Sequence, residues 1–221
     1  AIFPEPIPEP PLDTLRLLGL GGQRRASVGL EGYPTYEPTG IAANVARVRA
    51  IYPAFTAEEA QAFAARFEHE PAGLSNELAR LRAQFTQLRD GLRLWRDALL
   101  NEIPATDPPL KYIQQRALLQ NRALFKKAVE RCWRREGSAG GNMLQITEPL
   151  IGELPTLDAD FSHVTLLSFQ GSPGTLGVDR FLQNFPSLRS LDLHDLNMPR
   201  LPQSLSAMPQ LQHLTLRNCG I

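Results

Sequence analysis

The chain has 221 residues, 43% of them hydrophobic, and its 23 basic and 23 acidic side chains cancel to a formal net charge of zero. Such a chain can bury a core of its own, but it has no net positive charge to attract nucleic acid or an anionic membrane. No apolar run is long enough to cross a bilayer, and Cys132 and Cys219 form no CxxC pair. We therefore expect no nucleic-acid partner, no membrane span and no disulfide scaffold.

The segment 1–38 is expected to form a linker and a small hairpin. Residues 1–14 are rich in proline, which has no backbone donor and favours extended chain, so they are interpreted as a linker. In residues 15–38, alternation around Val28 and a turn at Gly32 predict a short β-hairpin with irregular flanks. The chain begins without Met and ends inside a repeating pattern, so we expect it to be a piece of a longer protein.

Residues 39–137 follow a helical period and are expected to form a helical domain. A short helix closed by Pro53 comes first. Thr56 and Glu59 have the spacing of a capping box, in which each side chain accepts a hydrogen bond from the other residue's free N–H. This box predicts a second helix that runs to about His69.

Two long helices complete the predicted domain. The first carries an apolar stripe at alternating spacings of four and three, which consists of Leu74, Leu78, Leu81, Phe85, Leu88, Leu92, Trp95 and Leu99. After a short proline-containing break, a second stripe ends near Glu136, so the two helices are expected to pack antiparallel. Cys132 continues the second stripe and is expected in the core. The alternative is a thiolate activated by the neighbouring arginines, which would make the fragment itself an enzyme.

After the glycines at 137–141, residues 142–221 repeat alternating apolar pairs. The pairs are Leu144 and Ile146, Val164 and Leu166, Leu191 and Leu193, and Leu214 and Leu216. The intervals between successive pairs are unequal, but all of them are typical of leucine-rich repeats. Each pair is expected to form a strand with both side chains inward, followed by an extended return arm or, at Val178–Leu182, one helical turn.

The predicted fold class is therefore α+β, with antiparallel long helices followed by the start of a leucine-rich-repeat solenoid. The helices are expected to cap the first apolar edge of the solenoid, because an uncovered end would expose its core. Cys219 occupies a position where such repeats place Asn or Cys and is expected to be a small buried side chain.

Strand residues that point away from the core are expected to form a concave, protein-binding face. The candidate binding residues are His163, Thr165, Leu167, Arg189, Asp192, His194, Asp195, His213, Thr215 and Arg217. The sequence contains no phosphate-loop, zinc-protease or nucleophile-elbow motif. We therefore expect no catalytic residue, no metal site and no cofactor.

The helices, followed by DFSHVTLLSFQ and LPQSLSAMPQLQHLTLRNCGI, resemble the central region of bacterial novel E3 ubiquitin ligase (NEL) effectors and toxins, the IpaH-like group. The resemblance covers about residues 74–221, and residues 15–73 more loosely. In that family the repeat selects the substrate and can restrain a following helical ligase domain, whose catalytic motif is Cys-x-Asp. This chain contains no Cys-x-Asp, so no catalytic residue carries over.

The resemblance implies a secreted virulence protein that acts in the host cell cytoplasm. Its partners would be a host protein target and, through a downstream domain, a ubiquitin-conjugating enzyme. We therefore expect the chain to be the non-catalytic target-recognition segment of a secreted bacterial E3 ubiquitin ligase. The alternative is a structural scaffold or interaction module of a bacterial toxin that has no ligase activity.

Overall fold

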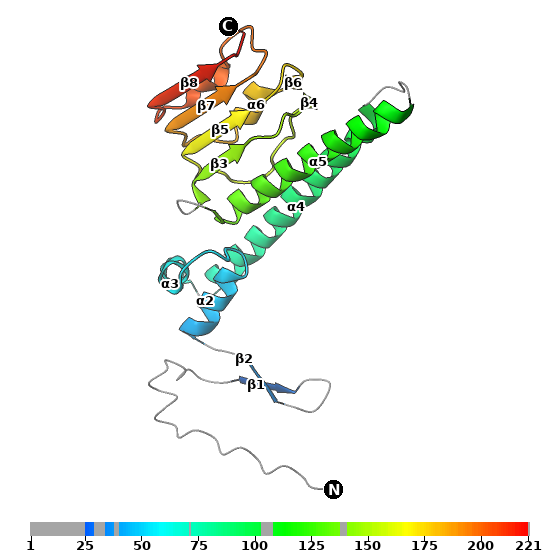
Figure 1. Ribbon diagram of the computed structural model, residues 1–221. Helices are drawn as coiled ribbons and strands as arrows, with labels where there is room; N and C mark the ends of the chain where they lie inside the picture. The colour runs from blue at the N-terminus through cyan, green and yellow to red at the C-terminus, as the bar shows by residue number, and fades with distance from the viewer. Residues whose placement is uncertain are drawn as a thin grey trace. The chain divides into compact units, whose positions relative to one another are not determined.

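The structure, a computed structural model, describes residues 25–28, 34–37, 40–70, 72–102, 108–137 and 141–220 (Figure 1). The predicted linker at 1–14 lies outside the described residues, as do the turn of the predicted hairpin, the break at 103–107 and residues 138–140. The described chain is of the α+β class, because helices precede a parallel sheet.

Contacts divide the chain into two compact units. The first comprises residues 1–50 and 55–74, and the second comprises residues 51–54 and 75–221. The long helices and the parallel sheet both belong to the second unit, so the boundary placed at 137–142 from the sequence falls inside it.

The first unit contains a hairpin and short helices. Strands β1 (Arg25–Val28) and β2 (Pro34–Glu37) pair antiparallel, in the segment where the sequence predicts a hairpin. Helix α2 (Ile41–Arg49) is the short helix expected before Pro53. Its Val48 is fully buried, as the helical period requires.

Helix α3 (Ala57–Ala65) begins with the predicted capping box. The backbone N–H of Thr56 donates to Glu59 Oε2 at 2.8 Å, and the N–H of Glu59 donates to Thr56 Oγ1 at 3.1 Å. The helix ends earlier than predicted, at Ala65, and the chain continues to His69 as turns. The start was therefore specified locally, while the end had no comparable signal.

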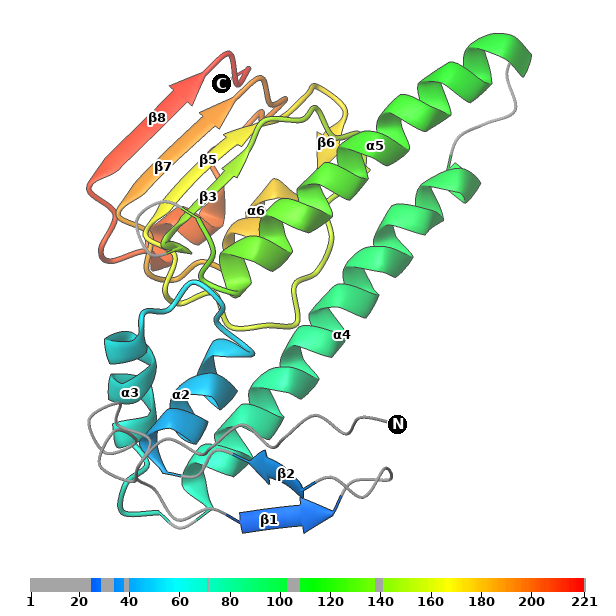
Figure 2. The same cartoon turned by 60° about the horizontal axis from the view of Figure 1, so that its bottom comes forward.

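The long helices α4 (Gly73–Glu102) and α5 (Pro108–Trp133) run side by side in Figures 1 and 2. The Trp133 ring stacks on Phe85 at 5.2 Å between centroids, and the Phe125 ring lies 5.0 Å from that of Trp95. From Phe85 to Trp95 along α4, the contacting residue on α5 moves back from Trp133 to Phe125, so the two helices run in opposite directions. The predicted antiparallel packing is confirmed.

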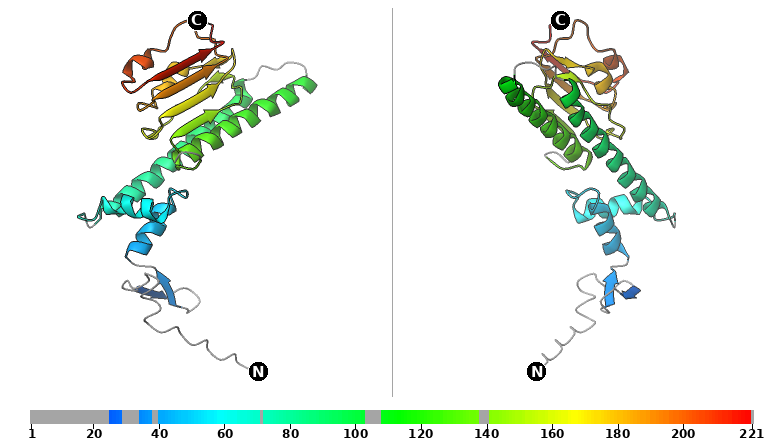
Figure 3. Two further views of the ribbon diagram at one scale, coloured as in Figure 1. Left: turned by 60° about the vertical axis from the view of Figure 1, so that its left-hand side comes forward. Right: turned by 90° about the vertical axis from the view of Figure 1, so that its right-hand side faces the viewer.

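The second unit continues with a sheet of parallel strands in the order β3, β5, β7, β8 (Figure 3). Its strands are β3 (Met143–Ile146), β5 (Leu166–Gln170), β7 (Ser190–His194) and β8 (His213–Arg217). A second parallel pair joins β4 (Gly152–Glu153) to β6 (Thr175–Leu176). Helix α6 (Val178–Leu182) is the predicted helical turn, and a 3-10 helix, η2 (Gln203–Ala207), follows later.

The register of β5 corrects the sequence alignment. Leu144, Leu167, Leu191 and Leu214 stand opposite one another across the sheet. The inward pair of β5 is thus Leu167 and Phe169, and the prediction that Val164 and Leu166 form it was wrong. A shift of one residue turns a strand's side chains to the opposite face, so Leu166 points outward, while Val164 lies buried before the strand.

With this correction the strands are evenly spaced along the chain, and one backbone pattern recurs between them. The carbonyl of Asn142 accepts hydrogen bonds from the N–H groups of Thr165 and Leu166, at 2.8 and 3.2 Å. The Thr165 carbonyl accepts in the same way from Arg189 and Ser190 at 2.8 and 3.0 Å. The Arg189 carbonyl in turn accepts from the next two N–H groups along, those at 212 and 213. The three accepting carbonyls, those of Asn142, Thr165 and Arg189, therefore follow one another at nearly equal intervals.

The helices cover the β3 edge of the sheet, where the sequence predicted that they would. Three alternate carbonyls after β3 accept hydrogen bonds from helix side chains. Asn121 donates to the Pro149 carbonyl at 3.0 Å, Arg122 donates to the Ile151 carbonyl at 3.1 Å, and Trp95 donates to the Glu153 carbonyl at 2.8 Å. Carbonyls at every second residue face the same side of an extended chain, so the helices satisfy the free side of the segment that follows β3 and includes β4, which would otherwise need water or another strand.

Aromatic rings continue this contact into the core. Phe125 of α5 lies 5.8 Å from Phe181 of α6, and Phe181 lies 5.2 Å from Phe185. Phe185 in turn lies 5.5 Å from Phe161, which precedes β5. The helices and the sheet therefore share one apolar core.

Candidate functional site

The outward side chains of the sheet form one surface, called here the outward sheet face. It consists of Met143, Gln145, Leu166, Ser168, Gln170, Ser190, Asp192, His194, His213, Thr215 and Arg217. The intervening side chains point into the core: Leu144, Leu167 and Leu191 are at most 2% exposed. This alternation is the two-residue period of a sheet with one buried face.

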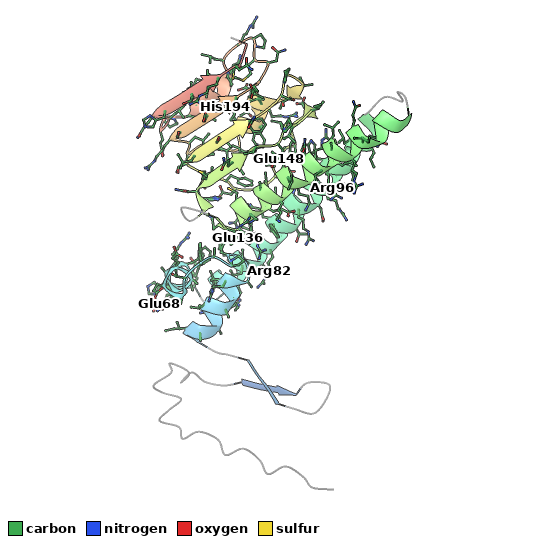
Figure 4. The ribbon with its side chains drawn as sticks, viewed as in Figure 1. Glu68, Arg82, Arg96, Glu136, Glu148 and His194 are labelled. Atoms are coloured by element: carbon green, nitrogen blue, oxygen red, sulfur yellow. The ribbon has the colours of Figure 1, made fainter. Side chains whose placement is uncertain are left out.

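Half of the predicted binding residues lie on this face. They are Asp192, His194, His213, Thr215 and Arg217. Asp192 stands opposite Thr215, and His194, labelled in Figure 4, stands opposite Arg217, so the register brings these residues together across β7 and β8. Their role in binding stays a prediction.

An internal contact organises the charges of the face. His194 Nε2 lies 2.7 Å from Asp192 Oδ1, and both side chains are partly exposed. The Asp192 carboxylate is therefore engaged within the face. Arg217 has no acidic partner among the described residues, so its guanidinium is available to a ligand.

Arg189 and Asp195 lie at the two ends of β7 rather than on the outward sheet face. Arg189 precedes the strand and is exposed. Asp195 follows it with a left-handed φ of 56°, and its Oδ1 accepts a hydrogen bond from Asn218 Nδ2 at 2.7 Å. Asp and Asn tolerate this backbone region better than most residues, so Asp195 primarily shapes the turn.

Leu167 does not belong to the candidate surface. Its side chain is 2% exposed and lies in the core between Leu144 and Leu191. An inward pair of Val164 and Leu166 predicts an outward Leu167, and the register of β5 shows that this prediction was wrong. In its place the structure puts Leu166 on the face. The sequence did contain a signal for this register. The leucines that stand opposite one another in the sheet are separated by nearly equal intervals in the sequence.

Thr165 and His163 precede β5 and were also misplaced. Thr165 is half-buried and contributes its backbone to the pattern described above. His163 lies in a turn, where its ring stacks on Phe161 and its Nε2 lies 2.9 Å from the carbonyl oxygen of Cys132. Because a carbonyl only accepts, Nε2 carries the proton. His163 thus joins the sheet to the end of α5.

The surroundings of His163 hold it neutral. Burial lowers its pKa from 6.5 to about 4, and the positive charge of Arg135 acts in the same direction. The hydrogen bond to Cys132 and the charge of Asp160 oppose this effect without cancelling it. For Asp160, burial raises the pKa, but the hydrogen bonds from Ser162 and the nearby positive groups outweigh it, so the net pKa is lowered.

Cys132 is a core side chain. It is 3% exposed, and its Sγ faces the carbonyl oxygen of Gly141 at 3.6 Å. Burial raises its pKa to about 12, and Arg135 only partly offsets this effect. The thiolate form required of a nucleophile is therefore suppressed at neutral pH. Cys219 is buried as well, as predicted.

No family model, curated protein or solved structure matches this chain. Within the part of the chain that the structure describes, no helix is both long and apolar enough to cross a membrane. The same residues contain no group of three or more His, Cys, Asp or Glu side chains that could hold a metal ion.

Sequence reasoning missed the polar residues that join the helices to the sheet. Asn121 and Arg122 were not singled out, although Arg122 is 1% exposed and its guanidinium lies 4.5 Å above the Trp95 ring. The available signal was the position of Arg122 one helical turn before Phe125, on the apolar stripe of α5. A cation at such a position needs buried acceptors.

Proposed function

We propose that residues 141–220 are stacked units of a leucine-rich repeat and that the outward sheet face binds a protein. The observation that carries the repeat assignment is the hydrogen-bond pattern at Asn142, Thr165 and Arg189, which recurs at nearly equal intervals along the chain. Those intervals lie in the range of leucine-rich repeats. Parallel strands with one outward residue in two are the geometry that such repeats use.

Side chains in the turns after the strands support the same assignment. Ser172 and Cys219 occupy equivalent positions, because Leu167 and Leu214 stand equally far before them in the chain. Ser172 Oγ donates to the carbonyl of Leu150 at 2.7 Å, and Cys219 Sγ donates to that of Leu193 at 3.4 Å. Both bonds tie a turn to the segment around the preceding strand. Leucine-rich repeats place Asn or Cys at this position, so Cys219 matches the pattern and Ser172 departs from it with another small side chain.

Binding rather than catalysis follows from what the outward sheet face offers. Asp192, His194, Thr215 and Arg217 present charges and hydrogen-bonding groups on hydrogen-bonded strands, so little backbone entropy is lost when a partner contacts them. The one reactive side chain weighed from the sequence, Cys132, is buried and protonated. A broad polar sheet face of this kind is suited to protein recognition.

We further propose that the parent protein is a secreted bacterial effector of the NEL class that acts in the host cell cytoplasm. This proposal rests on the sequence resemblance. The target would be a host protein, and any contact with a ubiquitin-conjugating enzyme would belong to a ligase domain outside these residues. The chain itself contains no Cys-x-Asp.

The test of the binding face is site-specific photocrosslinking. A photoreactive residue at Thr215 is expected to capture a host protein, while one at exposed Gln183 of the neighbouring turn is not. The captured protein, once purified, should bind an H194A/R217A variant about tenfold or more weakly than the unchanged chain. An R180A/R200A variant, whose arginines are exposed outside the outward sheet face, is the matched control. Equal loss in both variants would place the binding site elsewhere.

The scaffold alternative, a toxin module without ligase activity, is equally compatible with the buried state of Cys132 and with the lack of Cys-x-Asp in this chain. It is distinguished by incubating the parent protein with a ubiquitin-charged conjugating enzyme. Discharge that requires a Cys-x-Asp cysteine of the parent protein supports the ligase class. No discharge by the parent protein supports the scaffold.

A further inference from the structure

The zero net charge of the chain conceals an uneven distribution. Residues 75–136 contain thirteen Lys and Arg against seven Asp and Glu, a net charge of +6. Residues 1–74 and residues 142–221 each carry a net charge of −3. The α4–α5 hairpin is therefore a basic element, and local rather than total charge decides which partners it attracts.

One side of α5 concentrates this charge. It is called here the basic face of α5 and consists of Ile113, Arg116, Ala117, Gln120, Leu124, Lys127 and Arg131. These residues follow one another at intervals of one, three or four, which places them on one side of a helix. All are exposed, whereas Phe125, Val129 and Cys132 on the opposite side are buried.

The basic face of α5 carries few counter-charges of its own: of its three cations, Arg131 pairs with an acidic residue, Glu136, at 3.5 Å. Glu130 is the single acidic residue between 113 and 131, and its carboxylate pairs with Lys126, beside the face. Among the described residues, neither Arg116 nor Lys127 has an ion-pair partner. Several arginines of α4 differ, because acidic neighbours on the same helix pair with them: Glu77 pairs with exposed Arg80, and Asp97 pairs with the labelled Arg96 (Figure 4).

The same face exposes isolated aliphatic side chains. Ile113 is 69% exposed and Leu124 is 39% exposed. Along the helix they are separated by about three turns. Small Ala117 and flexible Gln120 lie between them. A second helix could place its own side chains in this interval, as ridges pack into grooves.

We propose that the basic face of α5 is a docking surface for an acidic, amphipathic helix of a partner protein. The partner helix would bring carboxylates to Arg116 and Lys127, and aliphatic side chains to Ile113 and Leu124. This surface is separate from the outward sheet face. The docking proposal therefore does not depend on whether the outward sheet face binds a target.

A protein helix suits the face better than a bilayer or nucleic acid. The apolar contribution comes from two aliphatic side chains only, which is comparable to or weaker than a single acyl chain. A single acyl chain binds a membrane only marginally. Nucleic acid would use the cations but leave Ile113 and Leu124 exposed. An acidic amphipathic helix engages both kinds of side chain over the length of the stripe.

The test uses the whole chain and a fluorescent synthetic helix of about five turns, with Glu facing Arg116 and Lys127 and Leu facing the aliphatic pair. Anisotropy is expected to rise with protein concentration, and less so at high salt. A peptide with Gln in place of Glu should bind about tenfold more weakly. The R116E/K127E variant should lose binding to a similar degree, and I113Q/L124Q should lose it without a change in salt dependence.

The R82E/R89E variant is the matched control, because it makes the same charge change on exposed positions of α4. Circular dichroism checks that each variant keeps its helices. Loss of binding in the α4 variant equal to that in R116E/K127E would show general charge attraction and overturn the proposal. It would also be overturned if neither peptide binds, if both bind equally, or if phosphatidylserine vesicles bind through the face and the acidic peptide does not.

Discussion

Trp95 offers the sharpest test of whether the helices and the sheet fold as one unit. Its indole N–H donates to the Glu153 carbonyl at 2.8 Å, and its ring lies 5.0 Å from that of Phe125. The guanidinium of Arg122 lies 4.5 Å above the same ring. Trp95→Ala removes all three contacts at the edge of the sheet.

The expected loss follows from these contacts. Truncating a buried aromatic side chain costs about 3–5 kcal/mol, and half-burial of Trp95 favours the lower end, about 3 kcal/mol. In a chain of this size that corresponds to about 6–12 °C in Tm. Trp95→Phe keeps most of the ring and leaves the Glu153 carbonyl without its donor, so it should cost about 1 kcal/mol.

Hydrogen exchange followed by mass spectrometry measures where stability is lost. Peptides from α5 and from β5 and β7 are expected to lose protection together in Trp95→Ala, because one core links them. Leu94→Ala is the control, since Leu94 is 67% exposed and should change stability by less than about 0.5 kcal/mol. If the strands keep their protection while the helices lose it, the helices are not an integral cap of the sheet.

Three further outcomes are expected. In urea denaturation, the free energy of unfolding should fall by roughly 1 kcal/mol from about pH 7 to about pH 5, because burial lowers the pKa of His163 from its ordinary value of 6.5 to about 4 in the folded chain. His163→Gln should reduce this pH dependence, and an unchanged profile in that variant would contradict the explanation. Iodoacetamide at neutral pH should label Cys132 and Cys219 only after unfolding, because both are buried and burial raises the pKa of Cys132 to about 12. Rapid labelling of Cys132 in the folded chain would support the enzymatic alternative. By chemical denaturation, Leu167→Ala should cost about 2–5 kcal/mol and Leu166→Ala less than about 1 kcal/mol, and equal costs would refute the register of β5.

Features that depend on neighbouring residues were predictable. The capping box of Thr56 and Glu59 forms as predicted, because both of its bonds lie within one helical turn. The six leucines of the α4 stripe are buried, and Phe85 and Trp95 are half-buried, for the same reason, since residues three and four apart share a helix face. The helical turn at Val178–Leu182 also follows from local sequence.

The candidate site was predicted only in part, because it depends on the neighbours of each strand. Asp192, His194 and Thr215 were placed correctly, since β7 and β8 each have a single plausible inward pair. His163 was not, because its contact with the carbonyl of Cys132 joins two segments that are far apart in the sequence. Sequence spacing carries no information about such an encounter.

The sequence by itself determined the helices, their antiparallel packing and the presence of repeated strands. The tertiary structure decided the frame of β5 and how the β3 edge of the sheet is covered. In VTLLSF, alternation fits an inward pair at Val164 and Leu166 as well as one at Leu167 and Phe169. Only hydrogen bonding to β3 and β7, which must align buried leucines on both sides at once, selects the second pair.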